Sequence, residues 1–368
     1  MSADHTLVDV AVVGGGQAGL AVSYYLRRAG LAPGTGYLVL DAEERGGGAW
    51  QHVWPSLTLF SPPDYSSLPG WPMPLTPDGS LPSAQHVVDY LAAYEARYEM
   101  PVRRPVRVRA VTRDDELAGR LRVDSAAGTW AARVVVSATG TWRRPFVPRY
   151  PGMELFAGRQ LHSTEYRGPE TLAGQRVIIV GGGNTAAQLL AELFLVARTT
   201  WMTLHPPRFL PDEVDGRVLF QRTAARRRAL AAGQPDPGPT GSLGDIVMVP
   251  SVRAARDRGV LTARPMFTRL TRHGVIAEDG QEVEADVILW CTGFRPDLAH
   301  LAPLGLRGPD GRITVNGTMA VRESRLHLVG YGDWAGLASA TLIGVGLNAR
   351  AAVDAIVAQR GASASPRP

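Results

Sequence analysis

Two glycine-rich runs in this chain have the spacing of dinucleotide-binding loops. The first reads Gly14-Gly-Gly16-Gln-Ala-Gly19, and the second reads Gly181-Gly-Gly183-Asn-Thr-Ala186. Small residues at these positions allow a tight turn and a close approach of the backbone to a pyrophosphate, which then lies on the N-terminus of the following helix. Two such loops in one chain predict two bound nucleotides, an arrangement that passes electrons from a nicotinamide to a flavin.

The first loop has the complete context of a nucleotide-binding unit. An apolar strand over Val8–Val13 precedes it, a helix over Ala18–Arg28 follows, and the next strand, Tyr37–Leu40, ends in Asp41. An acid about 20 residues beyond the loop is the expected partner of a ribose diol. The predicted contacts of this first nucleotide, FAD, are Gly14, Gly16, Gln17, Ala18, Gly19 and Asp41.

The second loop follows the strand Arg176–Val180, and its next strand, Thr199–Leu204, ends without an acid. A missing carboxylate beside an arginine suits a 2′-phosphate, so NADPH is favoured over NADH. The alternative is that His205 and Arg208 are loop residues facing water. The predicted contacts of this nucleotide are Gly181, Gly183, Asn184, Thr185, Ala186, His205 and Arg208.

A loop of this kind joins a strand of a parallel sheet to a helix. The order of apolar strands and helical segments around the two loops predicts how the chain is divided into domains. We expect an α/β fold with two Rossmann-like domains, one nested within the other. The FAD domain comprises residues 1–148 and 286–368. The NADPH domain comprises residues 149–285, with an insertion on the substrate side near 206–260. A Pro/Gly-rich stretch at 234–244 predicts a surface loop.

The C-terminal part returns to the first domain with a strand over Leu326–Asp333 and a helix over Ala335–Ala358. Gly332 and Asp333 at that junction suit the ribityl and pyrophosphate groups of a flavin, although Asp333 could also be a helix cap. The tail from Gly361 is predicted to be disordered.

Composition excludes several classes of protein. All 39 basic residues are arginine, so Schiff-base chemistry on a lysine is excluded. The net charge of +5 is spread along the chain and does not indicate nucleic-acid binding. The single cysteine, Cys291, excludes a Cys-x-x-Cys redox pair and a cysteine-rich metal site, and no metal is expected. Without a signal peptide or an uninterrupted apolar span, a cytoplasmic protein is predicted.

A third motif lies just upstream of the second loop. Phe156-Ala-Gly158-Arg-Gln-Leu-His162-Ser-Thr-Glu-Tyr166 resembles the F-x-G-x-x-x-H-x-x-x-Y/F identifier of the class B flavin-containing monooxygenase superfamily at every fixed position. Gly47-Gly48-Ala-Trp50 resembles the turn that this family places against its flavin. Ser137–Gly140 and Cys291-Thr292-Gly293 resemble its two domain-crossing strands, so Gly48, Trp50, Thr292 and Gly293 become further predicted cofactor contacts.

Within that superfamily the chain is most similar to the short bacterial branch associated with arsenic resistance (ArsO-like). The likeness is carried by segments 61–74, 209–216, 244–250 and 331–334. It implies that NADPH reduces bound FAD, and that O₂ then forms a C4a-hydroperoxide. This species would oxygenate a soft nucleophile containing sulfur, nitrogen or trivalent arsenic.

The resemblance also suggests three residues with catalytic roles: Trp50 beside the flavin, Ser61 and His162. Many relatives that oxidise heteroatoms place an asparagine in the stretch where this chain reads Thr58-Leu-Phe-Ser61, so either Ser61 takes that role or the oxygenating step is arranged differently. His162 is expected to support the interdomain hinge rather than act as a proton-transfer base.

Two other functions remain open on the same scaffold. One is an NAD(P)H-dependent flavin reductase or oxidase, and the other is a non-catalytic flavoprotein that senses redox state. The substrate is expected to be a small molecule, and a homodimer is possible.

Overall fold

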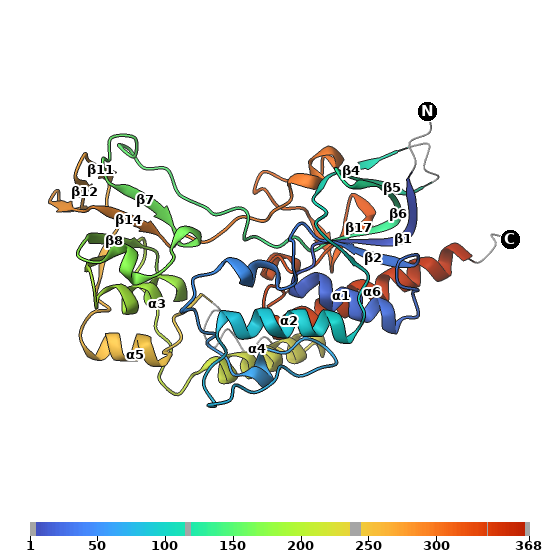
Figure 1. Ribbon diagram of the computed structural model, residues 1–368, viewed down its shortest axis with the longest axis horizontal. Coiled ribbons are helices and arrows are strands. Elements are labelled where there is room, and N and C mark those ends of the chain that lie inside the picture. Colours follow the sequence, from blue (N-terminus) through green and yellow to red (C-terminus); the bar gives the residue numbers. More distant parts are fainter. Residues whose placement is uncertain (1–4, 115–118, 236–243, 337, 365–368) are drawn as a thin grey trace.

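The computed structural model describes residues 5–114, 119–235, 244–336 and 338–364. These residues form two lobes, each built on a parallel sheet and joined by long chain crossings (Figure 1). Strands β1–β6 and β15–β17 form the sheet of the first lobe, and the intervening β7–β14 belong to the second. The predicted α/β fold with one nucleotide-binding domain nested in another is confirmed.

The first sheet has the strand order β15-β16-β17-β6-β1-β2-β3 in the described part of the chain. Its central strands run parallel, and the β4–β5 hairpin pairs onto β6. The bounds are β1 Thr6–Val13, β2 Tyr37–Leu40, β3 Val102–Arg103, β4 Val108–Arg113, β5 Leu121–Ser125, β6 Gly128–Ser137, β15 Val315–Asn316, β16 Met319–Ala320 and β17 Glu323–Leu328.

Central strands of this sheet are apolar along their length because both faces are covered. Helices α1 (Gln17–Arg28) and α6 (Leu342–Ala364) pack on one face, together with α2 (Ala84–Arg97). The hairpin and the 3₁₀ segment η6 (Ala299–Leu304) cover the other face. The side chain of Ser83 caps α2 by accepting a hydrogen bond from the His86 amide at 3.2 Å.

The second sheet has the order β10-β9-β8-β14-β7, with every pair parallel. Helices α3 and α5 cover one face, and the small β11–β13 sheet covers the other. The bounds are β7 Arg159–His162, β8 Arg176–Val180, α3 Asn184–Leu193, β9 Arg198–Thr203, α5 Pro250–Asp257, β10 Ala263–Pro265, β11 Arg269–Leu270, β12 Gly274–Ile276, β13 Glu282–Glu284 and β14 Val287–Trp290.

Three predicted boundaries are wrong. Strand β14 pairs with β7 and β8, so the chain leaves the second sheet after Trp290 and not at residue 286. The last helix begins at Leu342, because residues after Asp333 form a 3₁₀ turn, η7 (Asp333–Ala335), and a loop. That helix continues to Ala364, beyond the predicted start of a disordered tail. Residues 236–243 of the predicted surface loop and 365–368 of the tail lie outside the described residues.

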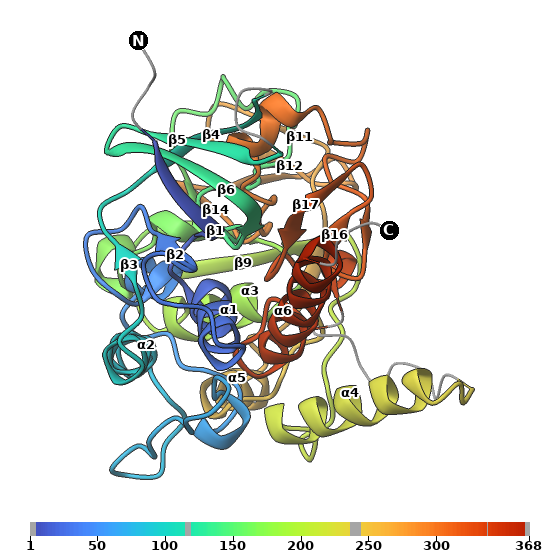
Figure 2. The same cartoon turned by 90° about the vertical axis from the view of Figure 1, so that its right-hand side faces the viewer.

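The insertion after β9 carries helix α4 (Gly216–Ala231) back to the first lobe. The Phe220 ring stacks on Phe60 with 5.9 Å between centroids, and the Gly216 amide donates to the Phe60 carbonyl at 3.1 Å. Beyond this contact α4 extends away from the body of the molecule (Figure 2). The insertion is therefore a further connection between the lobes.

Among the described residues, one helix is apolar and long enough to span a membrane by length and composition. It is the Leu342–Gly361 part of α6, and 44% of its most apolar window is buried. Val345, Ala349 and Val353 of this helix belong to the core that α6 shares with α1 and the sheet. In the structure, α6 is therefore a core helix of the first lobe.

Two buried histidines make the stability of this fold depend on pH. Burial lowers the pKa of both His300 and His327 to about 4. Because the folded-state pKa lies below the unfolded value, the unfolded chain takes up more protons as the pH falls through about 6.5. Stability is expected to fall between pH 6.5 and 4 by about 1.4 kcal/mol per pH unit for each histidine.

Urea unfolding of the holoprotein at pH 5 and 7.5 measures this loss. The His327→Asn variant should lose less stability between the two pH values, and an unchanged difference would contradict the assignment.

Candidate active site

The first glycine loop joins β1 to α1 with almost no space around its backbone. Gly14 has φ +108°, and a Cβ there would lie 2.5 Å from the Ala138 carbonyl oxygen. A Cβ on Gly19 would lie 1.8 Å from the Gly14 carbonyl oxygen. Both positions therefore require glycine, and the start of α1 is held close to the end of β1 and to the segment that follows β6.

Helices α1 and α3 both begin without a side-chain cap. Gly16 and Gly183 are their N-cap residues, and neither helix has an acid in its first turn. Open N–H groups and the positive end of the helix dipole favour a phosphate at each position. A Cβ on Gly16 or Gly183 would have its nearest neighbour 3.8 Å away, so the space beside each N-terminus is open. The residues present fit two nucleotide pyrophosphates.

Asp41 lies where the sequence places it, at the end of β2 and against the first loop. A Cβ on Gly15 would lie 2.7 Å from the Asp41 carboxylate. Asp41 is buried, and its Oδ2 accepts a hydrogen bond from Arg104 Nε at 2.6 Å. Arg104 also donates to both carboxylate oxygens of Glu95, at 2.6 and 2.8 Å. These partners offset the desolvation of the carboxylate, and no spacing in the sequence indicates them.

The turn containing Gly47 and Gly48 packs directly on the first loop. A Cβ on Gly48 would lie 2.7 Å from Gly16 Cα. Trp50, in η1 (Gly48–His52), donates from Nε1 to Gln17 Oε1 at 2.9 Å. Gln17 in turn donates to the Ala340 carbonyl at 2.7 Å. Trp50 and Gln17 thus link this turn, the first helix and the segment before α6.

The segment after β17 also meets the first helix. A Cβ on Gly330 would lie 2.6 Å from the Cβ of Ala18. Gly332 has φ +91°, and Asp333 Oδ1 accepts from the Ala338 amide at 3.0 Å. Asp333 therefore stabilises a turn ahead of α6, and Thr341 Oγ1 accepts from the Gly344 amide at 3.0 Å at the start of that helix.

The second loop is built like the first. Gly181 has φ +132°, and a Cβ there would lie 2.3 Å from the Cys291 carbonyl oxygen. Asn184 donates to the Asp245 carbonyl and accepts from the Val247 amide, each at 2.9 Å. Its side chain therefore binds the insertion to the start of α3. Thr185 is half-buried, and Ala186 is buried against the core of the second lobe.

His205 and Arg208 follow β9 as predicted, and both are exposed. The Arg208 side chain is 79% exposed, and its Nε lies 3.7 Å from Asp245 Oδ1. The sequence shows no acid after β9, but the fold brings one there from the insertion. Asp245 thus places a carboxylate beside the arginine that is predicted to bind a 2′-phosphate.

Two chain segments cross between the lobes as an antiparallel pair, which we call the crossing ribbon (residues 138–146 and 291–297). The Phe146 amide donates to the Gly293 carbonyl at 3.0 Å, and the Asp297 amide donates to the Gly140 carbonyl at 2.9 Å. The Thr292 hydroxyl donates to the Phe146 carbonyl. Gly293 has φ +77°. Thr292 and Gly293, predicted to contact a cofactor, form this ribbon.

His162 ends β7 and holds the ribbon at the second lobe. Its Nε2 lies 3.1 Å from the Gly293 carbonyl, to which it must donate, and Nδ1 accepts from the Thr164 amide at 3.2 Å. Burial lowers the pKa of His162. Both ring nitrogens are occupied within the protein, which matches a role at the hinge and not that of a base.

Ser61, the remaining catalytic candidate, is buried, and Trp54, Trp71 and Cys291 also lie in internal contacts. Ser61 Oγ lies 2.8 Å from Ser66 Oγ, so its hydroxyl has a protein partner. Trp54 packs at 6.5 Å from Tyr166 in the second lobe, and Trp71 packs at 5.3 Å from Tyr90 in the first. Burial raises the pKa of the Cys291 thiol far above its usual value, so this cysteine is not a reactive thiolate.

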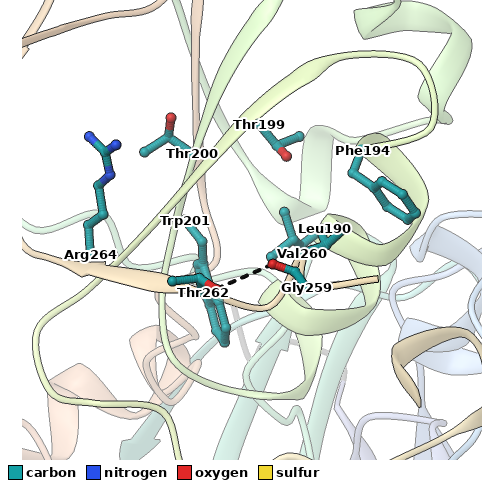
Figure 3. Close-up of a pocket in the computed structure, with 9 residues that line it drawn as sticks. All are labelled: Leu190, Phe194, Thr199, Thr200, Trp201, Gly259, Val260, Thr262 and Arg264. Carbon is teal, nitrogen blue, oxygen red and sulfur yellow. Dashed lines mark hydrogen bonds between the residues drawn. The ribbon is translucent and has the colours of Figure 1, made fainter. Parts of the chain in front are cut away.

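A shallow pocket of about 440 Å³ lies at the outer edge of the second sheet (Figure 3). Thr199 and Thr200 at the start of β9 line it, with Arg264 on β10. The glycine loops lie at the opposite, carboxyl ends of their strands. Trp201 also lines the pocket, and its Nε1 donates to the Gly181 carbonyl at 2.7 Å, so one lining residue contacts the second loop.

Comparison with known proteins agrees with this geometry. A family model described as pyridine nucleotide-disulphide oxidoreductase matches residues 11–208, and a second with the same description matches residues 246–350. A flavin-containing monooxygenase from Stenotrophomonas maltophilia is 50% identical, with a TM-score of 0.86 over 96% of this chain and 99% of that chain.

More distant relatives extend the comparison. An uncharacterised CzcO-like oxidoreductase of Geobacillus kaustophilus is 27% identical over 80% of this chain and 83% of that protein. The indole-3-pyruvate monooxygenase YUCCA1 of Oryza sativa subsp. japonica is 28% identical over 78% of this chain and 77% of that protein. The chain belongs to the pyridine nucleotide-disulphide oxidoreductase family and is an oxidoreductase of the flavin monooxygenase type.

Proposed function

We propose that this protein is an NADPH-dependent, FAD-containing monooxygenase that oxygenates a soft heteroatom in a small molecule. FAD is assigned to the first loop and NADPH to the second. When bound, the flavin accepts a hydride from the nicotinamide and, with O₂, supplies the oxygen atom that the substrate receives.

One observation carries the proposal: the crossing ribbon begins against one glycine loop and ends against the other. The Ala138 carbonyl meets Gly14, and the Cys291 carbonyl meets Gly181. The seven residues 291–297 span roughly 20 Å when extended. Two phosphate sites held at this separation by one hydrogen-bonded ribbon suit two dinucleotides whose reactive rings meet between them.

The roles of the site residues follow from their positions. Open helix N-termini at Gly16 and Gly183 bind the two pyrophosphates. Asp41 accepts from the adenosine ribose of FAD, and Arg208 binds the 2′-phosphate of NADPH, with His205 beside it. Trp50 forms a wall of the flavin site, and the hydroxyl of Ser61 pairs with that of Ser66 in a buried polar contact.

The choice of a soft nucleophile is supported by the state of the three buried histidines, none of which is available as a base. His162 has both ring nitrogens engaged, and burial keeps His300 and His327 neutral at physiological pH. A substrate with its own reactive electron pair needs no base to activate it. Sulfur, a neutral amine and trivalent arsenic have this property, and the last suits the ArsO-like branch, a place in arsenic resistance and a cytoplasmic location.

Two alternatives keep the same scaffold. A reductase of the dithiol type is disfavoured because the chain has one cysteine, whose buried thiol is not ionised. The measurements below distinguish the monooxygenase from an oxidase that releases hydrogen peroxide. They also distinguish it from a redox sensor without turnover. A homodimer is part of the proposal, and its test is the mass of the holoprotein in solution.

Anaerobic mixing with NADPH is expected to bleach the flavin absorbance of the purified protein. Oxygenated buffer with a thioether, an amine or a trivalent arsenical should then give one product molecule per NADPH and little hydrogen peroxide. Peroxide equal to the NADPH consumed, with every substrate class, would identify an oxidase. Failure of NADPH to reduce the flavin would favour the sensor.

Matched substitutions at the two N-cap glycines test which loop binds which nucleotide. A carboxylate at a helix N-terminus repels phosphate, whereas a methyl group there adds bulk but no charge and meets no protein atom closer than 3.8 Å. Gly16→Asp should lose FAD during purification. Gly183→Asp should retain FAD but raise the KM for NADPH by about tenfold or more. Gly16→Ala and Gly183→Ala add bulk without charge, and each should weaken binding of its own nucleotide less than the matching aspartate does. Loss of FAD in Gly183→Asp would contradict the assignment.

The Arg208–Asp245 pair tests the preference for NADPH. Arg208→Ala should lower kcat/KM for NADPH by about tenfold while leaving that for NADH within about twofold. Asp245→Asn removes the competing charge and should improve kcat/KM for NADPH. Equal losses with both nucleotides in Arg208→Ala would show that Arg208 does not recognise the 2′-phosphate.

A further inference from the structure

Tyr331 is a buried tyrosine whose hydroxyl contacts Ser137 and Thr139, at the end of β6 and just beyond it. It follows β17, and its Oη lies 2.5 Å from Ser137 Oγ at the end of β6. It also lies 2.7 Å from Thr139 Oγ1 and accepts from the Thr139 amide at 3.3 Å. Ser137 Oγ lies 3.0 Å from His300 Nε2, in η6.

The direction of every hydrogen bond in this network is determined by its last acceptor. Thr139 Oγ1 lies 2.6 Å from the Asp297 carbonyl, which can only accept, so the single hydroxyl hydrogen of Thr139 points there. Tyr331 must then donate to Thr139, and Ser137 must donate to Tyr331. It follows that His300 Nε2 donates to Ser137, so the chain runs in one direction from His300 to Asp297.

This chain of hydrogen bonds ends on the crossing ribbon. Thr139 and Asp297 belong to its two segments, and Thr139 follows the residue whose carbonyl packs on Gly14. Burial raises the pKa of Tyr331 to about 12, so the phenol stays protonated and remains a donor through the physiological range. By donating to Thr139, the Tyr331 hydroxyl therefore holds the end of the crossing ribbon that lies beside the first glycine loop.

The same return segment is held at its other end by His162, which donates to the Gly293 carbonyl. The second lobe thus holds the ribbon through His162 at the Gly293 carbonyl, and the first lobe holds it through Tyr331 at Thr139. The Thr139–Asp297 bond joins the two segments of the ribbon, so it passes the Tyr331 contact on to the return segment.

We propose that Tyr331 is a positioning residue for hydride transfer, acting through Thr139 to fix the crossing ribbon, and with it the second lobe, relative to the first nucleotide loop. The proposal rests on the proposed function for its kinetic consequence. Its structural part, that Tyr331 holds the ribbon, stands independently.

The test compares Tyr331→Phe with Tyr90→Phe in the holoprotein. Tyr90 is a matched control: it is buried in the same lobe, and its hydroxyl accepts from the Leu68 amide at 2.8 Å and donates to the Trp71 carbonyl at 2.7 Å. Amide hydrogen exchange over residues 139–146 and 292–298 reports the ribbon. Anaerobic stopped-flow reduction at saturating NADPH reports hydride transfer, and bound FAD is measured by absorbance.

Tyr331→Phe is expected to raise ribbon exchange and to slow flavin reduction by about tenfold at saturating NADPH, with FAD content and KM little changed. Thr139→Val should reproduce both effects. Ser137→Ala should have a smaller effect, because the Tyr331–Thr139–Asp297 part of the chain remains. Tyr90→Phe should lower thermal stability without either effect.

Three results would overturn the proposal. One is ribbon exchange in Tyr331→Phe equal to that of the wild type, and another is slowed reduction of equal size in Tyr90→Phe. If Tyr331→Phe does not fold, wild-type exchange in Thr139→Val would be the third. Should wild-type flavin not be reduced by NADPH, the proposed function fails, and the exchange data alone decide whether Tyr331 holds the ribbon.

Discussion

The structure depends on the contact between a glycine turn and a neighbouring carbonyl at the carboxyl end of each sheet. Gly14 packs on Ala138, and Gly181 packs on Cys291, in each case closer than any side chain would allow. This closeness directs the N-termini of α1 and α3 into open space, where their dipoles attract phosphate. The same carbonyls begin the two segments that cross between the lobes. Nucleotide binding and connection of the lobes therefore share one set of backbone atoms.

Charged groups and hydrogen bonds also position the chain segments around the two glycine loops. At the first loop, Asp41 accepts a hydrogen bond from Arg104, which also donates to Glu95, so one arginine holds Asp41 in place against the loop. At the second loop, Asn184 fixes the insertion to the start of α3 through two backbone bonds. The insertion then returns to the first lobe at Phe60 and Phe220, so its position depends on both lobes.

Much of this arrangement could be predicted from the sequence, because glycine spacing and apolar runs are local signals. The strand Tyr37–Leu40 lies where it was predicted, and α1 begins one residue before the predicted helix. The partners of Asp41, the approach of Asp245 to Arg208, and the Tyr331 network could not be predicted. Each joins residues far apart in the chain, and no periodicity indicates which side chains a fold will bring together. The predicted domain boundary at residue 286 was wrong for a related reason. An apolar strand such as β14 fits either parallel sheet, and only its pairing with β8 shows that it belongs to the second sheet.

The nesting of one lobe inside the other constrains the order in which the protein can fold during synthesis. The strands of the second sheet, from β7 to β14, are contiguous in the chain, so that lobe can form as soon as residue 290 has been made. The first sheet instead waits for β17, which pairs with β6 across nearly two hundred residues, as in Leu326 with Val135. Until then residues 135–137 of β6 lack a partner on the edge that β5 leaves open, and the apolar face of α1 lacks α6. A ribosome that stalls after the second lobe would therefore present a half-closed first lobe, and chaperones that shield strand edges should bind it there.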